Sequence, residues 1–390
     1  MLPTNRRAVL GAAATGGLML PSFLQTAEAQ HLAQPMPAGP KVVERTRHEE
    51  IPQFKYSLEG GHAKVTSGGW AKEVTAEQLP ISQGITGVHM FMNPGASREL
   101  HWHATAAEWA YILEGTCQAT VLDPAGNTEV LNFEPGDIWY FPRGHGHSVQ
   151  TIGREPCHFL LAFDSGHFSE NGTFSITDWM SLTPPEVLAR NFGLPASTFQ
   201  NFPKGETYIM QGAIIEKDSP QAQENVSNAG ARTHKYRLSS HKPQYDQKGG
   251  SLHLASAREF PISTTMTGGI MRMEPGVIRE MHWHPQANEW QYFIKGQAGI
   301  GLFGASGRNR IESFGPGDVS YVPAGYGHYV ENTGKETLEM LVIFDRGEYQ
   351  EISLSNWIAT SPPWLLSNNF GVDEKVLARF PKVNGIIRQG

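Results

Sequence analysis

The chain is poor in cysteine, in positive charge and in long apolar runs. Two cysteines in 390 residues cannot form a disulfide framework or a cysteine-based zinc site. Basic residues number 31 against 38 acidic ones, and the net charge of −7 argues against a protein that binds nucleic acid through its phosphates. The apolar stretch 8–24 is interrupted by glycine and proline and is a poor membrane span. We therefore expect no nucleic-acid partner and no stable membrane insertion.

Glycine, proline and histidine are instead plentiful. The 42 glycines and 26 prolines are spread along the chain, which indicates many turns rather than one disordered segment. The length suggests two or three domains, each large enough to bury its own core. Sixteen histidines against two cysteines point to imidazole chemistry.

The first 29 residues have the features of an export signal. Arg6 and Arg7 precede the apolar stretch, and Ala27-Glu28-Ala29 follows it as a cleavage site. Paired arginines before a weakly hydrophobic core resemble a bacterial twin-arginine signal, and an ordinary secretory signal is the alternative. We expect a periplasmic or extracellular protein, with residues 30–52 as an extended lead-in.

The remaining chain is one unit written twice. The triplet 101–103 recurs as 282–284 and the triplet 135–137 as 316–318, at an offset of 181 with no insertion up to about residue 165. Beyond that point Trp179 matches Trp357 at an offset of 178, so the first copy holds three extra residues. The predicted domains are 53–200 and 234–390, joined by a linker over 201–233.

Each copy consists of short apolar runs bounded by turn residues. The runs 110–113, 117–122, 138–141 and 157–163 have the length and spacing of strands in an antiparallel sandwich or barrel. A helical pattern follows each barrel, at 185–191 and 363–369. The expected fold class is therefore all-β.

Three histidines and one glutamate in each copy have metal-ligand spacing. His101 and His103 are two residues apart, so on a strand both point into the barrel, and His147 lies on a returning strand. The two predicted quartets are His101, His103, Glu108 and His147, and His282, His284, Glu289 and His328. Three nitrogen ligands with one carboxylate and no thiolate favour Mn(II), Fe(II), Co or Ni over structural zinc.

The residues around these quartets carry a family resemblance. Segments 95–115 and 136–147 resemble the two cupin motifs, and 276–296 and 317–328 repeat them. The runs 98–103, 168–174 and 177–179 make the whole mature chain similar to the bicupin oxalate decarboxylases. The resemblance implies two tandem cupin barrels, each a double-stranded β-helix or jelly roll, with a few short helices after each barrel.

The resemblance also implies a reaction and its cofactors. Members of that family convert oxalate to formate and CO2, with Mn²⁺ at both sites (two per chain) and O2 as co-catalyst. A general acid is needed near the substrate carbon. The resemblance assigns this role to Glu170, in a mobile lid over 165–174 that includes Ser169, Asn171 and Gly172. The three extra residues of the first copy fall in this lid.

Two further residue types are expected to act with the lid. The resemblance gives Arg98, and Arg279 in the second copy, to the substrate carboxylate. Strict strand alternation would point residues 98 and 101 to opposite faces, so a bulge or loop must lie between them. Thr173 is expected either to orient Glu170 by a hydrogen bond or to act as a hinge.

Several alternatives stay open at this point. An oxalate oxidase making CO2 and H2O2, a non-catalytic metal-binding bicupin and a cupin dioxygenase for a larger substrate are the rival functions. The second site is expected to be metal-loaded and mainly structural or electron-relaying, although Glu351 lies at the offset of Glu170. Cys117 and Cys157 occupy buried strand positions, as a disulfide or as two thiols. A homo-oligomer is expected.

Overall fold

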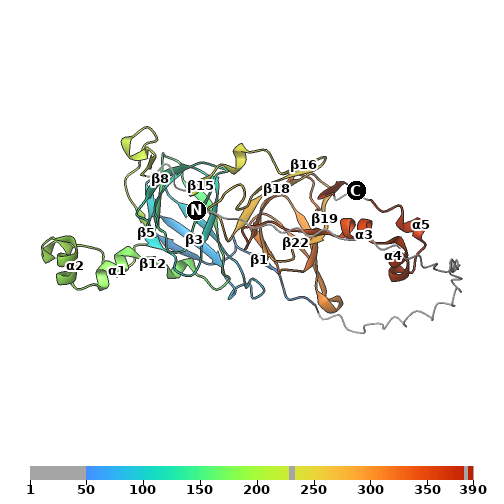
Figure 1. Cartoon of the computed structure of the whole chain (residues 1–390). Coiled ribbons are helices and arrows are strands. Elements are labelled where there is room, and N and C mark those ends of the chain that lie inside the picture. Colours follow the sequence, from blue (N-terminus) through green and yellow to red (C-terminus); the bar gives the residue numbers. More distant parts are fainter. Residues whose placement is uncertain (1–49, 228–232, 382–384, 390) are drawn as a thin grey trace, which may run out of the picture. The chain divides into compact units, whose positions relative to one another are not determined.

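Two β-barrels hold most of the regular structure (Figure 1). The computed structural model describes residues 50–227, 233–381 and 385–389, so the predicted signal peptide and most of the predicted lead-in lie outside the described residues. The barrels and the short helices that follow each of them confirm the predicted all-β fold class. None of the helices in the described ranges is long and apolar enough to cross a membrane.

The first barrel consists of two antiparallel sheets. Their strand orders are β12-β5-β10-β7-β8-β14, with β13 also paired to β5, and β15-β9-β6-β11-β4-β3-β2. The bounds are β2 Ala63–Thr66, β3 Gly69–Val74, β4 Thr86–Met92, β5 Ala96–Trp102, β6 Glu108–Glu114, β7 Cys117–Leu122, β8 Thr128–Phe133, β9 Ile138–Phe141, β10 Gly146–Thr151, β11 Cys157–Phe163, β12 Phe174–Ser175, β13 Ile209–Gln211, β14 Asn225–Val226 and β15 Lys235–Tyr236.

The second barrel repeats this plan with the sheet orders β1-β23-β20-β25-β18-β17-β16 and β22-β21-β24-β19-β26, and β27 also pairs with β19. The bounds are β1 Lys55–Ser57, β16 Tyr245–Gln247, β17 Gly250–Ala255, β18 Thr267–Met273, β19 Val277–Trp283, β20 Glu289–Lys295, β21 Ala298–Phe303, β22 Asn309–Phe314, β23 Asp318–Val322, β24 Gly327–Asn332, β25 Leu338–Phe344, β26 Ile352–Ser353 and β27 Ile387–Gln389.

The two halves of the chain exchange edge strands. β1 comes from the start of the predicted first domain but pairs with β23 of the second barrel. β15 comes from the start of the predicted second domain but pairs with β9 of the first barrel. β13 and β14, which lie in the predicted linker, pair with β5 and β8 of the first barrel. Each exchange covers an edge whose main-chain donors and acceptors would otherwise be unpaired.

Apolar side chains form a core inside each barrel and a third cluster between the barrels. Alternation along β6 serves two of these cores, because Ala110 and Ile112 point into the first barrel while Trp109 and Tyr111 point toward the second. Both faces of β6 are thereby buried, and the strand is apolar along most of its length.

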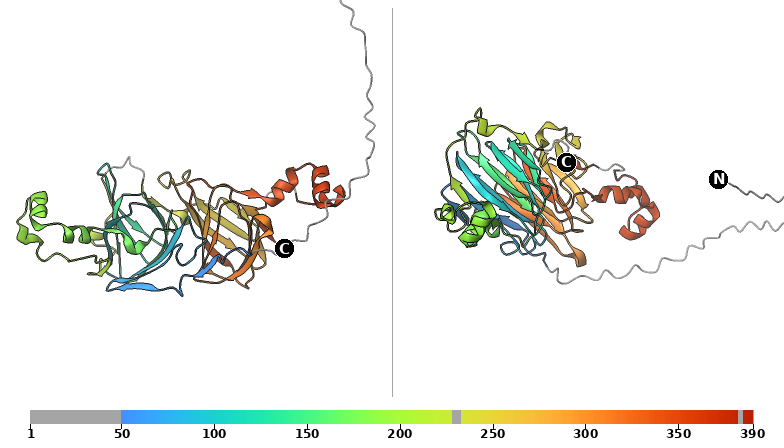
Figure 2. Two further views of the ribbon diagram at one scale, coloured as in Figure 1. Left: turned by 90° about the horizontal axis from the view of Figure 1, so that it is seen from below. Right: turned by 60° about the vertical axis from the view of Figure 1, so that its left-hand side comes forward.

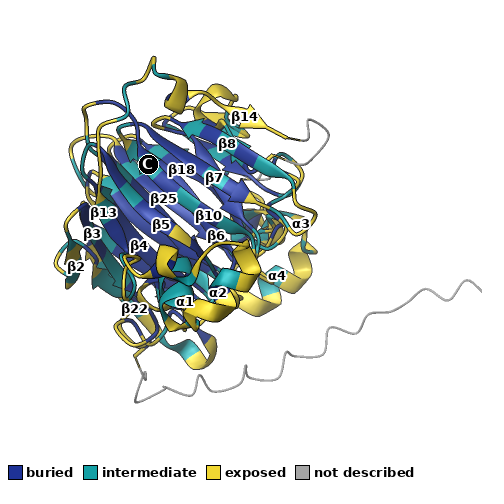
Figure 3. Cartoon of the chain, turned by 90° about the vertical axis from the view of Figure 1, so that its left-hand side faces the viewer, coloured by how far each residue is buried: buried dark blue, intermediate teal, exposed yellow. Residues whose placement is uncertain are grey.

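Short helices follow each barrel. Their bounds are α1 Ile176–Leu182 and α2 Pro185–Phe192 after the first, and α3 Leu354–Thr360, α4 Pro363–Phe370 and α5 Glu374–Leu377 after the second. α2 and α4 confirm the predicted helical patterns; each begins with proline and ends at a left-handed glycine. The helices stand off the barrels (Figure 2), and their exposed surface contrasts with the buried strands (Figure 3).

Candidate active site and metal centres

Strands β5, β6 and β10 bring the first predicted quartet together. His101, His103, Glu108 and His147 are buried, and their ligand atoms all lie within 4.8 Å of one another. Oε2 of Glu108 lies 2.9 Å from Nε2 of His103 and 3.4 Å from Nε2 of His147. The pairing of β10 with β5 places His147 opposite His101. All four ligands therefore lie close together inside the barrel.

Hydrogen bonds behind the ligands fix their orientation. Nδ1 of His101 donates to the carbonyl of Glu99 at 2.6 Å, and Nδ1 of His147 donates to the carbonyl of His145 at 2.9 Å. Each bond places the proton on Nδ1, so that the Nε2 lone pair faces the cluster. Nε1 of Trp139 donates to the second carboxylate oxygen of Glu108 at 2.7 Å.

The electrostatics of the quartet suit a divalent cation. Burial lowers the pKa of His101 well below its usual range, and the nearby charge of Arg98 lowers it further. Burial would raise the pKa of Glu108, but hydrogen bonds and charge interactions with His103 and His147 lower it overall. Neutral imidazole and ionised carboxylate are the forms that bind a metal. The donor set therefore fits Mn²⁺, with nitrogen and oxygen ligands and no sulfur.

The second predicted quartet has the same build. His282, His284, Glu289 and His328 are buried, with ligand atoms within 4.8 Å of one another. Nε2 of His284 and Nε2 of His328 lie 3.1 and 3.0 Å from Oε2 of Glu289. The structure thus contains both four-residue metal-binding sites that the sequence predicts.

A β-bulge brings Arg98 to the first quartet. In the pairing of β5 with β10, His147 faces His101 but Val149 faces Arg98, so the register shifts between them. This is the irregularity that strand alternation predicted. The guanidinium is buried, and its carbon lies 4.2 Å from the centre of the Tyr208 ring.

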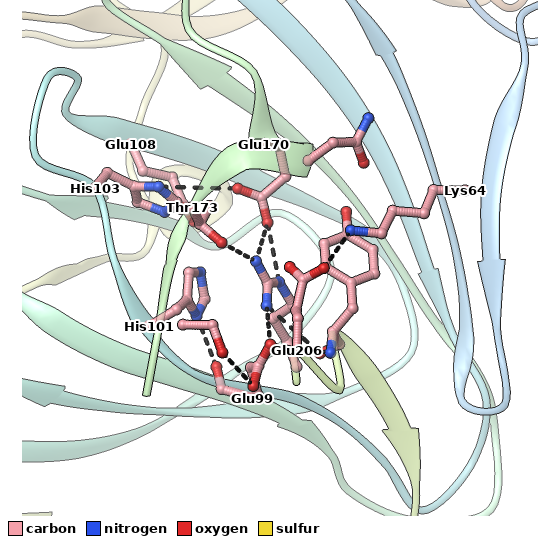
Figure 4. A network of polar contacts seen from close by, with 12 residues as sticks. Lys64, Glu99, His101, His103, Glu108, Glu170, Thr173 and Glu206 are labelled. Carbon is pink, nitrogen blue, oxygen red and sulfur yellow. Dashed lines mark hydrogen bonds and ion pairs between the residues drawn. The ribbon is translucent and has the colours of Figure 1, made fainter. Parts of the chain in front are cut away.

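The lid glutamate is held by this arginine. Glu170 is 1% exposed, and its Oε1 accepts from Nε of Arg98 at 2.9 Å. Oε2 of Glu170 lies 3.9 Å from Nδ1 of His103 (Figure 4). Thr173 accepts from Nη2 of Arg98 at 2.8 Å. The threonine therefore contacts the arginine that holds Glu170 and does not bond the carboxylate itself.

The second barrel has a related arrangement without the threonine. Arg279 forms an ion pair with Glu351, and the Tyr349 hydroxyl lies 3.2 Å from Nη2 of Arg279 and donates to Glu351 at 2.5 Å. Glu351 thus takes the place that Glu170 has in the first barrel. The three extra residues of the first copy consequently follow the glutamate, where Asn171, Gly172 and Thr173 lie.

Two residues at the first site, Glu99 and Tyr208, were not predicted as site residues from the sequence. Glu99 is 2% exposed and accepts from the hydroxyl of Ser175 at 2.8 Å and the main-chain NH of Tyr208 at 3.0 Å. Its recurrence as Glu280 was an available signal. The sequence contains no comparable signal for Tyr208, because this residue lies in the predicted linker. The pairing of β13 with β5 brings it next to Arg98. The φ of Tyr208, 57°, is in the left-handed region.

The two cysteines are free buried thiols in the structure. Burial raises the pKa of the Cys117 thiol well above its usual range, and contact with Cys157 adds to the effect. A protonated, buried thiol is unreactive. Of the two alternatives, the structure has the pair of inert thiols.

Comparison with known proteins agrees with this geometry. The cupin family model matches residues 58–200 and 236–377, so the chain contains two cupin domains. It is 40% identical over 317 residues to the oxalate decarboxylase OxdC of Bacillus subtilis, covering 81% of this chain and 82% of the relative. A probable oxalate decarboxylase of Arthroderma benhamiae is 33% identical over 335 residues, covering 85% of this chain and 82% of that protein.

A solved structure of the Bacillus subtilis oxalate decarboxylase, a protein with Mn(II) centres, superposes with a TM-score of 0.83 at 37% identity, over 89% of this chain and 91% of that one. The chain therefore belongs to the oxalate decarboxylase family of bicupins, as its motifs predicted.

Proposed function

We propose that the chain is a manganese-dependent oxalate decarboxylase whose catalytic site is the first barrel. The reaction takes oxalate and one proton to formate and CO2. The observation that carries the proposal is Glu170, which Arg98 holds by one carboxylate oxygen while the other faces His103. The chain belongs to a family whose relatives are named oxalate decarboxylases, and this supports oxalate as the substrate.

The metal is assigned from the donor set. His101, His103, Glu108 and His147 would hold one Mn²⁺, and the second quartet would hold another. When bound, Mn²⁺ supplies Lewis acidity and, with O2 as co-catalyst, redox chemistry that weakens the bond between the two oxalate carbons.

The protein's own residues supply binding and the proton. Arg98 carries a fixed positive charge at the quartet and binds a carboxylate of the substrate dianion. After CO2 leaves, Glu170 donates its proton to the remaining carbon, forming the C–H bond of formate. The lid excludes water during this step, and Glu170 regains a proton from solvent once the lid opens.

The second barrel is proposed to be a metal-loaded site with a mainly structural or electron-relaying role. Arg279 and Glu351 form an ion pair there, but the segment after Glu351 lacks the three residues that follow Glu170 in the first barrel. The shorter segment supports a site that opens less readily to substrate.

The deciding experiment is product analysis on oxalate with the purified, Mn-loaded protein. Formate and CO2 in equal amounts support the decarboxylase. H2O2 with two CO2 per oxalate would identify an oxidase, and the absence of turnover together with absence of bound metal would identify a non-catalytic bicupin. Turnover of a larger organic substrate with O2, in place of oxalate, would identify a dioxygenase.

Export and assembly are also part of the proposal. The twin-arginine pattern at Arg6 and Arg7 supports export to the periplasm or beyond, and replacing both by lysine should retain the precursor in the cell.

Exposed apolar side chains on the helices after each barrel, including Trp179 at 65% exposure and Leu182 at 83% on α1, support a homo-oligomer. Light scattering of the purified protein tests this, and a monomeric mass would contradict it.

A further inference from the structure

The tip of the lid, residues 169–173, is flanked on both sides by residues that are hydrogen-bonded to the barrel. On one side the carbonyl of Phe168 accepts from the hydroxyl of Thr86 at 2.8 Å. On the other side β12 pairs with β5, where Ser175 faces His101. Among the described residues, every polar contact between the tip and the rest of the barrel goes to Glu73, Arg98 or His103. The closed position of the tip therefore depends on very few side chains.

Glu73 makes more of these contacts than either Arg98 or His103. It lies near the end of β3 and its carboxylate accepts from three successive lid residues. Oε1 accepts from the Ser169 hydroxyl at 2.8 Å and from Nδ2 of Asn171 at 2.8 Å. Oε2 accepts from the main-chain NH of Glu170 at 3.0 Å and lies 3.1 Å from the Ser169 hydroxyl. A carboxylate is the side chain that accepts this many bonds at once.

The second barrel has no carboxylate at the position that matches Glu73. The residue at that position is Leu254, whose side chain has no hydrogen-bond acceptor. The segment that matches the lid is held from inside instead, because Nδ1 of His284 donates to the carbonyl of Gln350 at 2.8 Å. Leu254, Tyr349 and Gln350 line a cavity of about 760 Å³. The carboxylate is thus present only in the barrel that carries the longer lid.

We propose that Glu73 is a positioning residue that latches the lid of the first barrel closed and sets how long Glu170 stays over the site. Glu73 is half-buried and contacts the tip from β3, while the buried Arg98 contacts it from β5. Opening the tip breaks the four contacts at Glu73 and exposes the site to water. The consequence for catalysis rests on the proposed function, since an open lid would let the reacting intermediate escape before Glu170 protonates it.

The test replaces Glu73 by leucine, which copies the second barrel, and by glutamine, which keeps the shape but removes one acceptor. Glu77→Gln is the matched control, because Glu77 is an exposed carboxylate four residues further along the same segment. The first readout is hydrogen exchange of the peptide that contains residues 168–174. The second is the ratio of formate to H2O2 formed from oxalate.

We expect exchange of the Glu170 amide to accelerate roughly tenfold or more in Glu73→Leu and less in Glu73→Gln, because the amide loses its charged acceptor. The formate fraction should fall in the same order, with Glu77→Gln unchanged in both readouts. Wild-type exchange in both Glu73 variants would overturn the latch. Faster exchange with an unchanged product ratio would overturn its role in catalysis. A wild-type protein that makes no formate would refute the proposed function, while the exchange readout would still decide the latch.

Discussion

Oε2 of Glu170 and Nδ1 of His103 face each other at 3.9 Å, and neither atom has a hydrogen-bond partner among the described residues. The Nδ1 atoms of the other ligand histidines bond to main-chain carbonyls. His103 is therefore the ligand whose outer nitrogen is directed at the lid. A polar group of the substrate or a water molecule in this gap would satisfy both atoms and link the acid to the metal site.

Replacing Glu170 by glutamine should reduce formate production about 100-fold or more, because the proposed general acid is lost while the shape of the side chain is kept. Formate release from oxalate measures the effect, and H2O2 should rise relative to formate. Glu351→Gln is the matched control in the second barrel and should keep most activity. Substantial formate production by Glu170→Gln, or its loss in Glu351→Gln, would move catalysis to the second barrel.

Arg98→Lys should raise KM for oxalate and lower kcat, each by roughly tenfold. The guanidinium bonds Glu170 through Nε and Thr173 through Nη2, and a single ammonium group cannot reproduce this fork. Steady-state kinetics at fixed metal content separate the two constants. Arg154→Lys, at an exposed ion pair with Glu216, should leave both constants unchanged. An Arg98→Lys enzyme with normal KM would show that the arginine orients the lid without binding substrate.

Removing one ligand from each barrel should lower the manganese content by one ion per chain. His101→Ala should empty the first site and abolish formate production, whereas His282→Ala should empty the second. Metal analysis of the purified variants measures the loss. Chelation of the wild type should lower its melting temperature, because a metal that binds only the folded chain stabilises it. Full metal content in His101→Ala would contradict the assignment of the first quartet.

The features that depend on local spacing were predictable, and those that depend on contacts between distant segments were not. The quartets follow from the two-residue spacing of His101 and His103 and from exact repetition, because alternation on a strand is a local rule. Glu73 meets the lid across nearly a hundred residues of chain, and Tyr208 reaches Arg98 from a segment that reads as linker. The exchange of β1 and β15 likewise has no local signature, since either strand could pair with either barrel.

The contact between the barrels gives a stability prediction. Trp109 packs on Gly268 of the second barrel, and a Cβ added there would lie 2.5 Å from the tryptophan ring. Trp290 packs on Gly87 in the same way, where the distance would be 2.1 Å. Gly268→Ala should therefore destabilise the fold by about 1–3 kcal/mol through overpacking. Denaturant unfolding measures the change, with Gly146→Ala as the control because its added Cβ would meet open space.

Glu59 should make stability depend on acid pH. Its carboxylate lies 2.5 Å from Nδ1 of His89 in the first barrel and 3.1 Å from the hydroxyl of Tyr292 in the second. Burial would raise the pKa of Glu59, but the hydrogen bond and charge interaction with His89, the bond from Tyr292 and the charge of Lys72 lower it overall.

A carboxyl group whose pKa is lower in the folded chain stabilises the fold above its unfolded pKa of about 4.3. That contribution is lost as the pH falls through the folded value. Glu59→Gln should consequently be less stable than the wild type at pH 7, and the difference should shrink below about pH 4. The free energy of unfolding at several pH values measures this, with the exposed Glu77→Gln as a control that shows no such trend. A difference that is constant with pH would mean that the shape of Glu59, and not its charge, joins the barrels.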